Sequence, residues 1–68
     1  MVYKYIEIVG TSSVGIDDAV NNAFKEASKT VKNIHWGEMG RVTFRLDDNQ
    51  KIEYQAEVRI GFKIVRED

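Results

Sequence analysis

Trp36 and Gln55 are the two residues of the sequence whose side chains suggest binding chemistry. Trp36 is the only tryptophan, and its indole offers a large flat surface on which a planar ligand can stack. The amide of Gln55 carries both a hydrogen-bond donor and an acceptor, which suits the mixed polar edge of a heterocycle. Each residue also has a plainer interpretation, because tryptophan is usually buried and glutamine usually faces solvent. Residue type alone leaves the choice open.

Side chains that could carry out catalysis are few. His35 is the only histidine and there is no cysteine, so neither a zinc cluster nor a disulfide can form. We interpret His35 as a surface residue between a helix and a strand, and Asp47 and Asp48 as turn residues that hydrogen-bond locally. The glycines follow no phosphate-binding pattern; they are Gly10, Gly15, Gly37, Gly40 and Gly61. We therefore predict a protein that is not an enzyme.

The first half of the chain predicts one strand followed by one helix. Residues 2–9 are dense in β-prone side chains, and residues 10–13 are typical of a loop. Gly15 suits the N-cap of the helix, and Asn33 can supply the left-handed residue that stops it. Between them, apolar residues recur every three or four positions, as on one face of a helix; they are Ile16, Ala19, Val20, Ala23, Phe24, Ala27 and Val31.

The second half predicts a β-hairpin. Residues 34–46 are extended, residues 47–50 form a polar turn, and residues 51–65 alternate between apolar and polar side chains. The order strand, helix, strand, strand indicates an α+β fold in which one antiparallel sheet lays its apolar face over the helix. We expect a single domain spanning residues 1–68, with open sheet edges that favour association.

The position of Trp36 within its strand decides whether it can bind a ligand. Extending the alternation of Val42, Phe44 and Leu46 backwards places Trp36 on the core face. Gly37 and Gly40 lie between, however, and glycine within a strand often marks a bulge. A single bulge would move Trp36 to the opposite face, which carries Gln55. Alternation alone favours a core tryptophan.

Size and charge limit the possible partners. A domain of 68 residues is marginally stable alone, and without disulfides or a metal its most plausible support is self-association. Ten basic and eleven acidic residues nearly cancel, which argues against nucleic acid as a partner. Residues 1–5 lack the charged-then-apolar pattern of a signal peptide, and no apolar run approaches the length needed to cross a membrane. We therefore expect a cytoplasmic protein with no membrane partner.

The ordered set of motifs resembles the dodecin family along nearly the whole chain. Residues 2–12 (VYKYIEIVGTS) are similar to the dodecin amino-terminal strand, and residues 33–36 (NIHW) to its helix-to-strand junction. Tyr54 and Gln55 match the Tyr-Gln pair of the family, and Gly61 and Phe62 match its late Gly-Phe. Matches along the helix are Asp17, Asp18, Ala19, Asn22, Ala23, Ala27 and Thr30.

This resemblance implies a β-α-β-β subunit whose three-stranded antiparallel sheet wraps around the helix. It also implies a hollow homododecamer in which flavins stack between symmetry-related tryptophans. Trp36 would then be the stacking residue and Gln55 the hydrogen-bond partner of the flavin. The implied function is storage, buffering and photoprotection of flavin, with FMN, riboflavin or FAD as ligand and FMN foremost.

Several positions depart from the family pattern and leave alternatives open. Gly37 replaces a frequent aromatic residue, and residues 39–45 differ from the commonest form. Arg45 and Lys63 are candidates to meet a flavin phosphate, although each also fits the plainer interpretation of an exposed cation. Some dodecins bind coenzyme A, and no residue here decides whether this chain does. The alternative function is a structural oligomer or interaction module that keeps the shell without a ligand.

Overall fold

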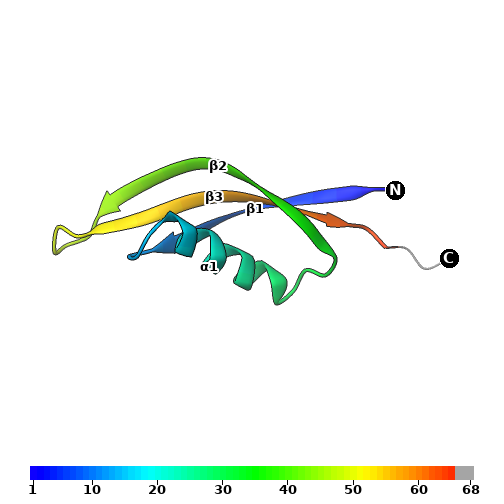
Figure 1. Ribbon diagram of the computed structural model, residues 1–68, viewed down its shortest axis with the longest axis horizontal. Helices are drawn as coiled ribbons and strands as arrows, with labels where there is room; N and C mark the ends of the chain where they lie inside the picture. Colours follow the sequence, from blue (N-terminus) through cyan, green and yellow to red (C-terminus); the bar gives the residue numbers. More distant parts are fainter. Residues whose placement is uncertain (66–68) are drawn as a thin grey trace.

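The computed structural model describes residues 1–65 and contains three strands and one helix. Strand β1 spans Tyr3–Ser12, helix α1 spans Ile16–Ser28, and strands β2 and β3 span Ile34–Leu46 and Ile52–Lys63. The helix lies along one face of the sheet, and the β2–β3 hairpin extends past its amino-terminal end (Figure 1). The last three positions of the predicted domain, 66–68, lie outside the described residues.

The three strands form one antiparallel sheet in the order β1-β3-β2. Strand β3 is therefore central, with β1 paired along one side and β2 along the other. This arrangement confirms the predicted β-α-β-β subunit with a single antiparallel sheet. It also leaves β1 and β2 as edge strands, whose outer backbone groups are a ready surface for association.

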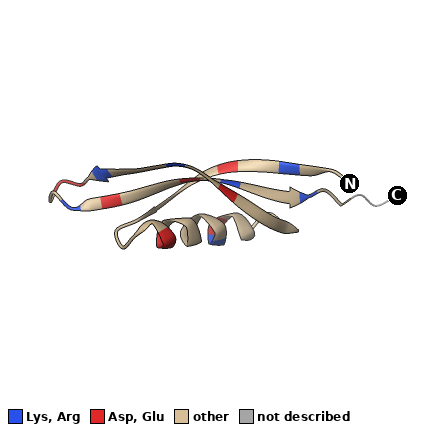
Figure 2. Cartoon of the chain, turned by 45° about the horizontal axis from the view of Figure 1, so that its top comes forward, with Lys and Arg blue, Asp and Glu red and all other residues tan. Residues whose placement is uncertain are grey.

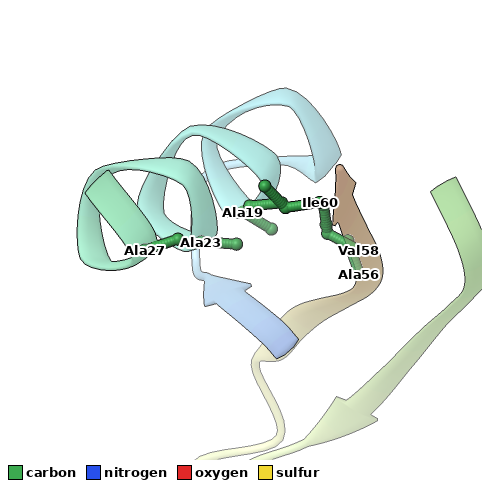
Figure 3. Packing of buried hydrophobic residues seen from close by; sticks show 6 residues of the cluster. All are labelled: Ala19, Ala23, Ala27, Ala56, Val58 and Ile60. Carbon is green, nitrogen blue, oxygen red and sulfur yellow. The ribbon is translucent and has the colours of Figure 1, made fainter. Parts of the chain in front are cut away.

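The core lies between α1 and the middle of the sheet. Helix α1 packs on β1 and β3, and the buried side chains are mostly small (Figure 3), namely Ala19, Ala23, Ala27, Ala56, Val58 and Ile60. The alanines let the helix approach the sheet closely. The approach is tightest at Gly10 of β1, where an added Cβ would lie 2.0 Å from the backbone oxygen of Ala19.

Two predicted boundaries were wrong by three residues, and the last strand is shorter than the predicted residues 51–65, since β3 spans Ile52–Lys63. Residues 10–12 belong to β1 rather than to a loop, because Gly10, Thr11 and Ser12 continue the ladder with β3. The helix ends at Ser28, before Val31. After it, the N–H of Thr30 donates to the carbonyl of Ala27, a tighter turn of the kind that often ends a helix. Asn33 does adopt the left-handed conformation, with φ of 63°, but in the connection to β2.

The hairpin turn matches its prediction. Asp47 organises the turn, since its carboxylate accepts hydrogen bonds from the N–H groups of Asn49 at 2.8 Å and Lys51 at 3.0 Å. Its backbone N–H also donates to the carbonyl of Lys51 at 2.9 Å. Gln50 is left-handed, with φ of 62°. This local bonding is the role expected for aspartate at such a turn.

Candidate functional site: an aromatic platform on the outer face of the sheet

Trp36 lies on the face of the sheet that is turned away from the helix. It pairs with Gly61 of β3, and Gly61 shares its side of the strand with Gln55 because strand residues alternate between faces. The pairing of β2 shifts by one residue between Met39 and Val42, and again between Ile34 and Trp36. The first shift contains Gly40, one of the two glycines near which the sequence predicted a bulge if Trp36 lies outside the core. We call this side of the sheet the outer face.

The second irregularity, at His35, was not predicted. Ile34 pairs with Phe62 and Trp36 with Gly61, so His35 is an extra residue within β2. It is exposed, as expected, and its ring is in T-shaped contact with that of Tyr3, with centroids 5.7 Å apart. The two irregularities together let Ile34 face the core while Trp36 faces outwards.

Two tyrosines of β1 contact the indole of Trp36 in T-shaped geometry. The ring centroids of Tyr3 and Trp36 lie 5.2 Å apart at an angle of 64°, and those of Tyr5 and Trp36 lie 5.7 Å apart at 82°. Such edge contacts are favourable for aromatic pairs. Because neither tyrosine is parallel to the indole, neither stacks on it, and 40% of Trp36 remains exposed.

Gly61 lies directly beneath the indole of Trp36. A Cβ added at Gly61 would lie 2.7 Å from two atoms of the indole six-membered ring. The indole therefore lies directly against the backbone of β3, where any larger residue would displace it. Tyr5, Gly61 and Trp36 form one row across all three strands. Together with Tyr3, we call these residues the aromatic platform.

Gln55 lies on the same outer face but far from Trp36. Its partner in β2 is Thr43, whose hydroxyl donates to the amide oxygen of Gln55 at 3.1 Å. This bond leaves the two amide N–H groups of Gln55 to donate to a ligand. Gln55 and Gly61 are six residues apart on β3, which corresponds to roughly 20 Å at about 3.3 Å per residue. One chain therefore cannot place both residues against the same ring.

The two candidate cations flank opposite ends of the outer face. Arg45 pairs with Glu53, next to the Thr43–Gln55 pair, and its Nε lies 3.1 Å from a carboxylate oxygen of Glu53. Lys63 pairs with Tyr3 at the aromatic end and is half-buried. The structure thus groups Arg45 with Gln55, and Lys63 with Trp36.

A charged cluster separates the two ends of the outer face. Arg59 of β3 lies 2.8 Å from a carboxylate oxygen of Glu7 on β1 and 3.5 Å from one of Glu38 on β2. Its guanidinium also lies 5.2 Å from the ring centroid of Tyr5. The hydrogen bond and the negative charge of Glu7 raise the pKa of Arg59 above its usual value. Acidic and basic positions are interspersed along the strands (Figure 2).

Sequence reasoning missed the residues that support Trp36. Tyr3, Tyr5 and Gly61 touch the indole, and Thr43 orients the amide of Gln55. The available signal was the alternation of β1, which puts Tyr3 and Tyr5 on one face of a strand. It could not identify Trp36 as their neighbour, because that contact depends on the bulges of β2.

We also searched residues 1–65 for a metal site and for a membrane-spanning helix. No cluster of three or more His, Cys, Asp or Glu side chains that could hold a metal is present among them. Within the same residues, no helix is both long enough and apolar enough to span a membrane. The exposed indole is the feature of the outer face that best suits a planar ligand, because a flat aromatic surface can stack on one.

The fold is that of a small α+β protein, with one helix on a three-stranded antiparallel sheet. The dodecin family profile matches residues 2–65. Dodecin from Thermus thermophilus is 33% identical over 63 residues, covering 93% of this chain and 91% of the relative. Calcium dodecin from Mycobacterium tuberculosis is 30% identical over 63 residues, covering 93% and 89%. The structure of dodecin from Streptomyces davaonensis superposes with a TM-score of 0.87 at 35% identity, covering 96% of each chain.

The chain belongs to the dodecin family. Dodecins are small flavin-binding proteins rather than enzymes, and proteins of this family assemble into oligomers. The family match confirms the resemblance on which the sequence-based expectations rested.

Proposed function

We propose that the chain binds flavin on the outer face of its sheet and stores, buffers and photoprotects it in the cytoplasm. The observation that carries the proposal is the indole of Trp36, which is 40% exposed and contacts Tyr3 and Tyr5 in T-shaped geometry, with no parallel aromatic neighbour in residues 1–65. A flat aromatic surface held in this way suits a planar heterocycle such as an isoalloxazine ring.

Gln55 supplies the polar part of the proposed site. With its amide oxygen occupied by Thr43, it offers N–H donors to the acceptors on the flavin edge. Because Trp36 and Gln55 lie roughly 20 Å apart along the strand, we assign the two contacts to different copies of the chain. The proposed site therefore forms at a contact between subunits of a homododecamer.

Photoprotection follows from the stacking. An indole in contact with an excited flavin can donate an electron to it, and return of that electron restores both partners without net reaction. Arg59 above Tyr5 disfavours a positive charge on that ring, so the proposed donor is Trp36. FMN is the foremost ligand, with riboflavin and FAD as further candidates and Arg45 or Lys63 placed to meet a phosphate.

Calorimetric titration with riboflavin, FMN and FAD tests the proposal. We expect saturable binding with at most one flavin per chain, and a comparison of the three ligands measures what a phosphate contributes. Coenzyme A, added to the flavin-loaded protein, tests whether it competes. Heat of dilution alone for all three flavins would favour the alternative of a structural oligomer without a ligand.

Light scattering tests the proposed assembly separately. We expect a mass near twelve chains for the wild-type protein. A monomer under the same conditions would contradict the shell and with it a site shared between subunits.

Replacing Gln55 with alanine should weaken flavin binding by about 1 to 3 kcal/mol, because a polar edge of the ligand loses its partner. The same titration measures the loss. Thr43→Val is the matched variant, since it keeps Gln55 but removes the hydroxyl that fixes its amide, and we expect a smaller loss. Equal affinity of wild type and Gln55→Ala would remove Gln55 from the site.

Replacing Gly61 with alanine should also weaken binding, although Trp36 is retained. The added Cβ would lie 2.7 Å from the indole, so the ring must move away from the backbone of β3 and lose its contacts with Tyr3 and Tyr5. We expect roughly tenfold weaker flavin binding, corresponding to about 1.4 kcal/mol, and a shifted indole emission spectrum. Wild-type affinity together with an unchanged spectrum would show that the platform does not need Gly61.

A further inference from the structure

The end of the β2–β3 hairpin carries an apolar patch. Within residues 1–65, no other part of the chain covers it. The patch consists of Val42, Phe44 and Leu46 on β2 and Ile52 on β3, on the helix side of the sheet. Their exposed fractions are 45%, 65%, 52% and 42%. Helix α1 does not reach them, because the hairpin extends past its end (Figure 1). We call these four residues the hairpin patch.

A groove lies further along the same side of the sheet, between α1 and β2. Because the helix packs on β1 and β3, it leaves space of about 500 Å³ beside β2. Most residues of its lining are apolar, and the polar ones are Asn21, His35 and Glu38; the apolar residues include Val20, Phe24, Ile34, Trp36, Met39 and Ile60. Phe24 and Met39 are about half-exposed.

We propose that the hairpin patch of one copy of the chain packs into the α1–β2 groove of another copy. Three of the four patch residues and one wall of the groove belong to β2, so a chain cannot fill its own groove without breaking this strand. The patch and the groove are both apolar and both uncovered, and each chain has one of each. The inference rests on the self-assembly included in the proposed function and identifies one surface that carries it.

The area of the hairpin patch indicates how strong a single contact would be. From the exposed fractions, the patch presents roughly 400 Å² of mainly apolar surface, in the range of the largest patches on monomers. Together with a similar area in the groove, one contact buries roughly 800 Å². A stable isolated interface usually buries about 1,200 Å² or more. One contact is therefore weak, and stability requires that several copies close into a ring.

The geometry of the contact allows such closure. A patch that meets a different surface on its partner forms a head-to-tail contact, which leaves one free patch and one free groove on each pair. Successive contacts either close a ring or continue as a filament. A closed ring fills every patch and every groove, and this outcome fits a family whose members form oligomers.

Cysteine crosslinking tests this contact, because the natural chain has no cysteine. We expect the double variant Asn21→Cys/Leu46→Cys, treated with a short bis-maleimide, to form a ladder of covalent multimers. The matched control is Asn21→Cys/Glu53→Cys. Glu53 lies at the same level of the hairpin but on the outer face, since it pairs with Arg45. We expect at least tenfold less multimer from the control.

A charge placed in the patch provides a second measurement. Phe44→Asp should retain the fold, because this side chain is 65% exposed, but its mass by light scattering should fall below that of wild type. An assembled protein that gives no ladder, or a control that crosslinks equally, would overturn the contact and leave self-assembly intact. A monomeric wild-type protein would overturn both. Flavin titration of the same samples reports on the proposed ligand separately.

Discussion

Replacing Trp36 with alanine is expected to weaken flavin binding by roughly 5- to 150-fold. Stacking of a nucleobase on an aromatic side chain contributes about 1 to 3 kcal/mol, and the larger isoalloxazine ring should fall at the upper end. The variant should also lose the quenching of flavin emission, because the electron donor is gone. Titration with riboflavin, followed by its fluorescence, measures both effects in one experiment.

Trp36→Phe is the control that separates stacking from quenching. Phenylalanine keeps an aromatic surface but is a much poorer electron donor, so we expect intermediate affinity with a longer emission lifetime for bound flavin. Trp36 is 40% exposed, and circular dichroism should show the same fold in all three proteins. Wild-type affinity in Trp36→Ala would exclude the indole from the site, even if flavin is bound elsewhere.

Replacing Gly10 with alanine is expected to cause the largest loss of stability. The added Cβ would lie 2.0 Å from the carbonyl oxygen of Ala19 and 2.9 Å from the side chain of Ala23. A backbone oxygen in a helix cannot move aside, so α1 must separate from β1. Overpacking of this kind costs about 3 kcal/mol, which in a domain of this size lowers Tm by roughly 10 to 20 °C.

Gly37→Ala is the matched control for this loss. It is also a strand glycine, but its nearest non-neighbouring atom would lie 3.6 Å from an added Cβ, an ordinary van der Waals distance. Thermal unfolding followed by circular dichroism should show a much smaller change in Tm. A Tm for Gly10→Ala within a few degrees of wild type would contradict the close approach of helix and sheet.

The fold was predictable because each element has its own local pattern. The helix stripe from Ile16 to Ala27 and the alternation of residues 51–65 identify their elements independently of any partner. The extension of β1 was harder to predict. Gly10, Thr11 and Ser12 have the composition of a loop, but pairing with β3 and the close packing of α1 keep them in the sheet. Here tertiary contacts override local propensity.

The sequence predicted an outward-facing Trp36 only if a bulge formed in its strand. Simple alternation from Val42 placed it in the core, and a bulge near Gly37 or Gly40 was needed to turn it outwards. The irregularity between Met39 and Val42 supplies that bulge. Bulges depend on how a strand meets its neighbours, so the sequence of β2 alone could indicate where one was possible but not that it forms.

The composition of the complete site could not be predicted from one chain. Tyr3, Tyr5 and Gly61 join Trp36 only when β1, β3 and β2 lie side by side. Gln55 then lies roughly 20 Å away on the same face, and only a second copy can bring it to the indole. Sequence patterns report on local structure, whereas the contacts of Trp36 require the sheet and the proposed flavin site also requires a second copy of the chain.

The most direct test of flavin binding at Trp36 is the emission of riboflavin during titration with the purified wild-type protein. We predict that emission falls steeply and reaches its minimum once there is at least one chain per flavin. Time-resolved decay should show a short-lived component that is absent in Trp36→Ala. Emission and lifetime equal to those of free riboflavin, with protein in excess and assembled, would contradict the account.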